Sequence, residues 1–158
     1  MNQVYQGVQF AESLTKVTAA VLRKTEKRLH VAFPEEYRDF LATVNSGIPT
    51  PSELVLAESA EKVCLDFLYG ISSSRESNDL DYEQQEILER TDGILPEGFI
   101  VIGIDPGGGT YFISTKGDKL GSIYIYDPDG FLDAAKIPRL HLVAHSFSEM
   151  LEKIVSNA

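Results

Sequence analysis

The chain has 158 residues, of which 43% are apolar, and this is enough for one domain to bury a core without disulfides or bound metals. Its single cysteine, Cys64, excludes an internal disulfide and a cysteine-based metal cluster. A formal net charge of −10 repels nucleic acid and favours either a basic partner or simple solubility.

The sequence contains no targeting segment that we recognise. No stretch approaches the roughly 20 apolar residues that a membrane-spanning helix needs, and the start, MNQVYQGVQF, lacks the basic and apolar regions of a secretory signal. We therefore expect a cytoplasmic protein with one domain, residues 1–158. Residues 1–17 show no clear period, and we expect an extension with one short element around 8–10.

Two helices are predicted in the first third of the chain. Thr18 is a suitable N-cap for an amphipathic helix over 18–30, whose stripe is Val21, Leu22, Thr25 and Leu29. The outer face of this helix is basic, and we interpret it as the solvated side. The second helix, 34–45, begins at a proline and has the stripe Tyr37, Phe40, Leu41 and Val44. Asn45-Ser46-Gly47 supplies its left-handed stop.

The middle of the chain combines two short strands with an acidic insert. Residues 48–52 are too rich in proline for regular structure, and the runs 53–58 and 63–69 suit strands. Residues 72–93 then carry seven acids and two bases, which is −5 of the total charge of −10. We expect a helix from Ser77 or Asp79 to about Arg90 in this insert, docked loosely through Tyr82, Ile87 and Leu88.

The strongest strand signal follows the insert. The runs 99–104, 110–115 and 122–127 are apolar and rich in β-branched and aromatic residues. Their connections are short and glycine-rich, so the chain reverses twice and forms an antiparallel meander.

The chain ends in a helix, which completes the predicted fold. Ser146 and Glu149 form a capping box in front of the apolar period of helix 147–156. We expect an α+β fold: a mostly antiparallel sheet of about five to six strands, with helices N-terminal and C-terminal to it packed on it. The predicted core includes Tyr37, Phe40, Leu41, Ile102, Phe112, Phe147 and Leu151.

Three short patterns suggest chemistry, and each has a simpler interpretation. The run 105–109 has the glycines of a phosphate loop, but a strand follows it where a helix N-terminus is needed. His141 and His145 have the spacing of two zinc ligands without an evident third. The run 127–130 resembles part of a calcium loop, but its frame lacks the first and last ligands. We find no catalytic constellation, and we expect no enzyme, metal site or cofactor.

Three motifs together resemble the SUKH superfamily, the fungal cell-wall-regulator-like and bacterial toxin-immunity proteins. The first is Leu-Pro, Ile-Gly-x-Asp, a glycine pair, a strand and Gly-x-Ile-Tyr-x-x-Asp, found at 95–96, 102–105, 108–109 and 121–127. The second is Phe-Pro-x-x-Tyr-x-x-Phe-Leu with Asn-x-Gly at 33–41 and 45–47, and the third is Ala-x-Ser-Phe-x-Glu at 144–149. Their order and spacing make the set more specific than each motif alone.

The resemblance implies a binding protein that neutralises a cognate toxin, such as a nuclease, by occluding it. Acids would then meet a basic toxin domain through steering and rim ion pairs, and the candidates are Glu76, Asp79, Asp81, Glu83, Glu86, Glu89, Asp105, Asp127 and Asp129. Alternatively these acids are only solvated. Two other functions stay open: a regulatory scaffold for cell-wall or signalling enzymes, and a small-molecule-binding domain. We expect no nucleic acid or membrane partner, and a monomer or weak homodimer.

Overall fold

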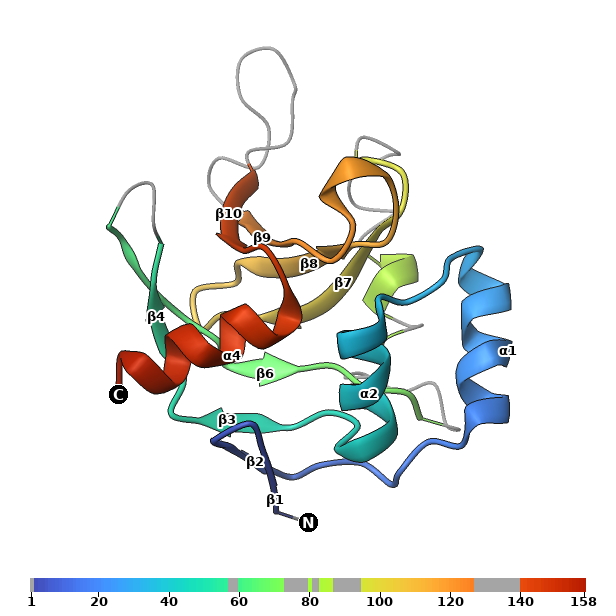
Figure 1. Ribbon diagram of the computed structural model, residues 1–158, viewed down its shortest axis with the longest axis horizontal. Coiled ribbons are helices and arrows are strands. Elements are labelled where there is room, and N and C mark those ends of the chain that lie inside the picture. Colours follow the sequence, from blue (N-terminus) through green and yellow to red (C-terminus); the bar gives the residue numbers. More distant parts are fainter. Residues whose placement is uncertain (1, 57–59, 73–79, 81–82, 87–94, 127–139) are drawn as a thin grey trace.

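A computed structural model describes residues 2–56, 60–72, 80, 83–86, 95–126 and 140–158 (Figure 1). The described strands form a five-stranded sheet in the order β10-β9-β8-β7-β6, a three-stranded sheet β1-β2-β3 and a two-stranded sheet β4-β5. Every strand pair is antiparallel. With α-helices before and after the five-stranded sheet in the chain, this is the predicted α+β fold.

The five-stranded sheet contains the predicted meander. Its strands are β6 (Phe67–Leu68), β7 (Phe99–Ile104), β8 (Thr110–Ser114), β9 (Ile123–Tyr126) and β10 (Leu140–Ala144), with a short 3₁₀ turn, η1 (Gly117–Lys119), between β8 and β9. Phe99 pairs with Ser114 and Ile104 with Thr110, so the predicted antiparallel neighbours are confirmed. Strand β8 lies in the middle of the sheet, and all five of its residues are buried.

The N-terminal region is built into the fold more fully than the sequence indicated. Strands β1 (Gln3–Tyr5) and β2 (Val8–Ala11) form a hairpin whose turn residues, Gln6 and Gly7, both have positive φ, as tight hairpin turns require. The side chains of Val8 and Phe10 are completely buried. We predicted one short element here, and the structure has two strands.

The proline-rich segment was also predicted incorrectly. Residues 48–50 form β3 (Ile48–Thr50), which pairs with β2. Pro49 is compatible with this strand because β3 lies at an edge of its sheet, where a missing N–H is tolerated. The next predicted strand is present as β4 (Glu53–Val55), whereas the run 63–69 is divided between β5 (Lys62–Cys64) and β6, which belong to different sheets.

The core is an aromatic cluster beneath α2 (Glu35–Thr43) and α4 (Phe147–Ser156). The ring of Phe40 lies 5.0 Å from that of Phe147 and 5.2 Å from that of Phe10, measured between centroids. All seven predicted core residues are buried. The predicted cap of α4 is confirmed, since Ser146 Oγ accepts a hydrogen bond from the Glu149 amide. Within the described ranges no helix is long and apolar enough to cross a membrane.

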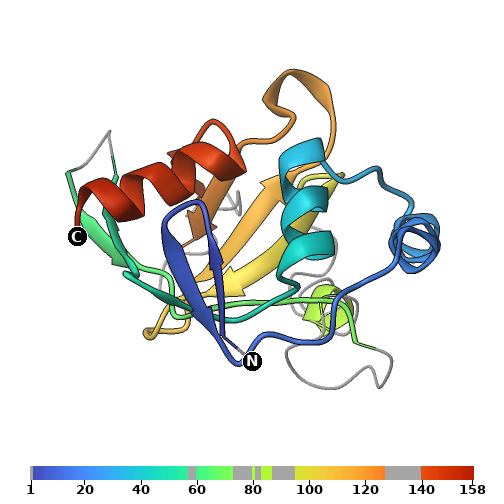
Figure 2. The same ribbon diagram turned by 60° about the horizontal axis from the view of Figure 1, so that its bottom comes forward.

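Helix α1 (Ala19–Leu29) lies at the periphery beside α2, and Figure 2 shows it nearly end-on. Its buried face is shifted from the predicted stripe: Val21 is 41% exposed, whereas Leu22, Thr25 and Glu26 are buried. Glu26 is tolerated because its carboxylate pairs with Arg38 and accepts a 2.7 Å hydrogen bond from the Phe33 amide. Burial alone would raise the pKa of Glu26, but these hydrogen bonds outweigh it and hold the pKa below its usual value.

Asn45 follows α2 and connects it by hydrogen bonds to the segments around Thr15 and Ile71. Asn45, Ser46 and Gly47 all have positive φ, as predicted for a left-handed stop. The buried Asn45 amide donates to the carbonyls of Thr15 (2.7 Å) and Ile71 (3.0 Å), and its oxygen accepts from the Ile71 amide (2.8 Å). The chain before α1 is therefore fixed beside the end of the 60–72 segment.

Candidate functional site

The described part of the acidic insert is attached to the central sheet by two buried residues. Residues 80 and 83–86 are helical. The amide of the completely buried Leu80 donates to the Gly70 carbonyl (2.6 Å). Gln84 is also buried, and its side-chain amide donates to the Phe99 carbonyl (3.1 Å) while its oxygen accepts from the Val101 amide (2.7 Å).

Gln84 completes an edge of the sheet that β6 leaves uncovered. Strand β6 pairs with β7 only at Gly103 and Ile104, so no strand among the described residues pairs with the first residues of β7 on that side. The carboxamide of Gln84 uses one N–H and its oxygen here, in the way that a peptide group of a neighbouring strand would, and it satisfies both backbone groups. Sequence reasoning assigned the docking of this insert to Tyr82, Ile87 and Leu88, which lie outside the described residues, and it missed Gln84.

Two of the candidate acids lie on this docked segment. Glu83 is half-buried and Glu86 is exposed. Because Gln84 and Leu80 anchor the segment, these two glutamates lie on a helical turn that is docked beside the first residues of β7.

Asp105 lies at the other end of β7, where it organises the glycine-rich hairpin. Its Oδ1 accepts a 2.7 Å hydrogen bond from the Gly109 amide, and the backbone of Asp105 bonds to Gly108 and Gly109. A Cβ atom at Gly109 would lie 2.8 Å from Asp105 Oδ2, so glycine is needed for this close approach. The run 105–109 connects two antiparallel strands, which agrees with the hairpin interpretation and not with a phosphate loop.

A small hollow of about 160 Å³ opens beside Asp105. Glu61 and His141 also line it, together with apolar and aromatic residues of the β4-β5 region and β9. Sequence reasoning did not find Glu61 or the grouping with His141, because residues from distant segments that line one hollow have no local signal in the sequence. The hollow can accept one long cationic side chain, whereas small-molecule pockets usually measure about 300–1,000 Å³.

The described candidate acids do not form one cluster. Glu83 and Glu86 are anchored near residues 99–101, and Asp105 follows the last residue of β7, which at about 3.3 Å per residue corresponds to roughly 15 Å along the strand. The other six candidates lie outside the described residues: Glu76, Asp79, Asp81, Glu89, Asp127 and Asp129.

The histidine pair does not have the arrangement of a zinc site on a helix. His141 lies in strand β10, and His145 follows the end of that strand. Among the residues that the structure describes, no three His, Cys, Asp or Glu side chains are grouped as a metal site requires.

The hydroxyl of Tyr111 lies near Asp105 but is neutral. Burial, with a smaller contribution from Asp105, raises the pKa of Tyr111 far above its usual value, so its hydroxyl stays protonated and donates to the Cys64 carbonyl.

Comparison with known proteins gives a match to one family model. The model of the SMI1 / KNR4 family (SUKH-1) matches residues 16–153. No curated protein matches the chain. The matched range contains α1, α2, the whole meander and most of α4.

Proposed function

The chain belongs to the SMI1/KNR4 family (SUKH-1), a family of immunity proteins, and from this premise we propose that it is a non-catalytic immunity protein acting in the cytoplasm. It binds one cognate toxin domain with a basic surface, such as a nuclease, and it neutralises the toxin by covering the active site or the substrate-binding surface. Family membership over residues 16–153 is the observation that carries this proposal.

The acids along β7 support an electrostatic contact with such a toxin. Glu86 is exposed beside the start of β7, and Asp105 borders the hollow beyond its end. Strand β7 itself is buried, so a partner must span the roughly 15 Å between its two ends to contact both positions. A lysine or arginine of that partner enters the Asp105 hollow. Acids at the rim raise the association rate and select the partner more than they raise affinity.

A matched pair of charge reversals tests this surface. We expect the double variant Glu83→Lys/Glu86→Lys to slow association with the toxin domain encoded by a neighbouring gene by about three- to tenfold at low salt. The difference from wild type shrinks as salt is added, because screening removes the steering. Association rates measured by surface plasmon resonance at two salt concentrations check this.

The control is the double variant Glu12→Lys/Glu152→Lys, which alters two exposed glutamates. Glu12 directly follows β2, and Glu152 lies on α4. Both double variants change the net charge by the same +4, from −10 to −6, since each reversal adds two positive charges. If the two variants slow association equally, only the overall charge matters, and the β7 surface is not the recognition surface.

Protection from the toxin tests the function itself. Cells that express the neighbouring toxin domain should survive when this protein is co-expressed and die when it is absent. A regulatory scaffold for cell-wall or signalling enzymes would give no protection and no complex with the toxin. That outcome would reject the immunity proposal whatever the charge reversals show.

A further inference from the structure

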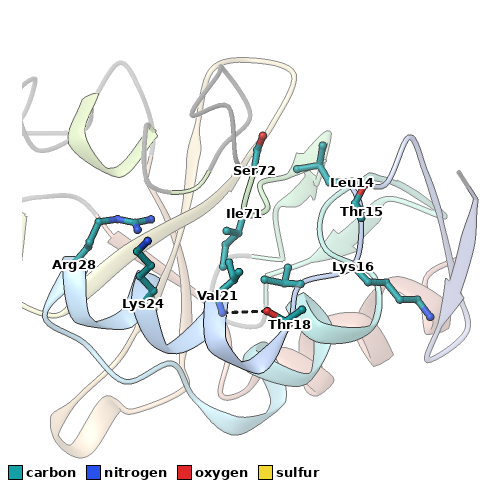
Figure 3. Close-up of a pocket in the computed structure, with 10 residues that line it drawn as sticks. Leu14, Thr15, Lys16, Thr18, Val21, Lys24, Arg28, Ile71 and Ser72 are labelled. Atoms are coloured by element: carbon teal, nitrogen blue, oxygen red, sulfur yellow. Dashed lines mark hydrogen bonds between the residues drawn. The ribbon is translucent and has the colours of Figure 1, made fainter.

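A groove lined by positively charged residues has none of the described candidate acids in its lining. It has a volume of about 520 Å³ and runs between α1, the segment 14–18 and the residues Ile71 and Ser72 (Figure 3). Asn45 fixes its walls through the hydrogen bonds to Thr15 and Ile71, and the Leu14 amide donates to the Asn45 carbonyl (3.0 Å). The groove is therefore part of the folded structure and is large enough for a ligand group.

The floor of the groove is apolar. Leu14, Val17, Val21 and Ile71 line it, and Figure 3 shows Val21 pointing toward Ile71. Val21 is 41% exposed, whereas its neighbour Leu22 on the same helix is buried. An apolar side chain of a partner that entered here would remove this surface from water.

The charged residues that line the groove, among those that the structure describes, are all positive. Lys24 and Arg28 follow Val21 at i+3 and i+7, so the three residues share one face of α1, and Figure 3 shows both cations on the side of Ile71. Lys16 lies at the other end of the groove and points away from it. None of the described residues that line the groove is acidic, although the chain as a whole has a net charge of −10.

We propose that this groove binds a short acidic segment of a protein partner, with one apolar side chain on the Val21–Ile71 floor and carboxylates beside Lys24 and Arg28. The local cations select acids through charge complementarity. Nucleic acid and anionic membranes fit less well, because each presents many negative charges to a broad area of a molecule whose net charge is −10, whereas a short acidic segment contacts the groove alone.

This site is independent of the proposed immunity function. It has the opposite charge to the acids along β7 and involves none of them. A failed toxin complex would leave the groove intact, and a failed groove experiment would leave the immunity proposal intact. If both hold, the protein can bind two partners, or two regions of one partner, that carry opposite charges.

Titration with defined peptides, followed by NMR of the ¹⁵N-labelled full chain, tests the groove. The probe is a fluorescein-labelled peptide with a central phenylalanine flanked by two glutamates on each side. We expect saturable binding, with amide shifts concentrated at Leu14, Val17 and Ile71. Replacing the phenylalanine with alanine should weaken binding about tenfold, since an apolar anchor is then lost. Replacing the glutamates with lysines should abolish binding.

Two lysines of α1 provide a matched pair of variants. Lys24 lines the groove and Lys27 does not, although both are exposed on the same helix. We expect Lys24→Glu to weaken binding of the acidic peptide about fivefold or more and Lys27→Glu less than about twofold. Well-dispersed NMR spectra of both variants check that they fold.

Three results would overturn the proposal. The first is no saturable shift with the acidic peptide up to millimolar concentration. The second is equal weakening by Lys24→Glu and Lys27→Glu, which means attraction to the helix as a whole. The third is equal binding of the alanine peptide, or of a single-stranded oligonucleotide of the same charge, which means a general anion site without an apolar anchor.

Discussion

The fold keeps the buried side chain of Glu26 in its charged form. Its carboxylate is buried, pairs with Arg38 and accepts a hydrogen bond from Phe33. The pKa of Glu26 is lower in the folded protein than in the unfolded chain, so the charged form stabilises the fold. This stability is complete above the unfolded pKa of about 4.3 and is lost as the pH falls through the lower, folded pKa.

We therefore expect the variant Glu26→Gln to be less stable than wild type by about 1–3 kcal/mol at pH 7, the range for hydrogen bonds to a charged group. The difference should narrow as the pH falls below about 4.3. Urea unfolding at pH 7, 5, 4 and 3 measures it. Glu152→Gln, an exposed glutamate on α4, should show a small difference that does not narrow. A constant difference for Glu26→Gln would mean that lost packing, and not charge, destabilises it.

At the scale of elements, the docking of the acidic insert depends on Gln84. The variant Gln84→Ala removes both hydrogen bonds to the backbone of β7, and we expect a loss of about 1–3 kcal/mol because two backbone groups lose their partners. Hydrogen exchange at the Val101 amide should accelerate far more than exchange at Phe112, in the middle of the sheet. The neighbouring variant Gln85→Ala changes an exposed amide and should leave both rates unchanged. Equal acceleration at Val101 and Phe112 would indicate global destabilisation.

The elements also show which features the sequence could predict. Helix α2, helix α4 and the meander were predicted because their apolar periods and end signals, such as Asn45 and Ser146, are local. Long-range pairing has no such signal. The prolines of 48–52 therefore predicted irregular structure, whereas pairing with β2 holds residues 48–50 as a strand. Glu26 was not predicted to be buried, because its partner Arg38 lies on another helix.

The candidate site follows the same division. The sequence identified the acids near β7 by their number and charge, but not their arrangement. It could not predict that Gln84 would anchor Glu83 and Glu86, because that contact joins the insert to a strand edge that β6 leaves open. Nor could it predict that Glu61 and His141 would line one hollow with Asp105, or that the basic face of α1 would border a groove with an apolar floor. Each of these groupings depends on contacts between segments that are far apart in the sequence.

At the scale of the whole molecule, the folding unit extends beyond the region that the family model covers. That region begins at residue 16, yet Val8 and Phe10 are completely buried, and the Phe10 ring lies 5.2 Å from that of Phe40, between centroids. The hairpin β1-β2 also supplies the strand that pairs with β3. The N-terminal residues are therefore part of the single hydrophobic core.

We expect the truncated chain 16–158 to lose cooperative thermal unfolding, because removal of the hairpin uncovers Phe40 and leaves β3 without its partner. The point variant Phe10→Ala should keep one cooperative transition and lose about 3–5 kcal/mol, the range for emptying a buried aromatic site. The matched control is Val4→Ala in the same hairpin, whose side chain is 73% exposed and which should change stability by less than about 0.5 kcal/mol. Calorimetry of the three proteins measures these effects. A truncated chain that unfolds cooperatively at the wild-type temperature would show that the hairpin is an accessory and that the core is complete without it.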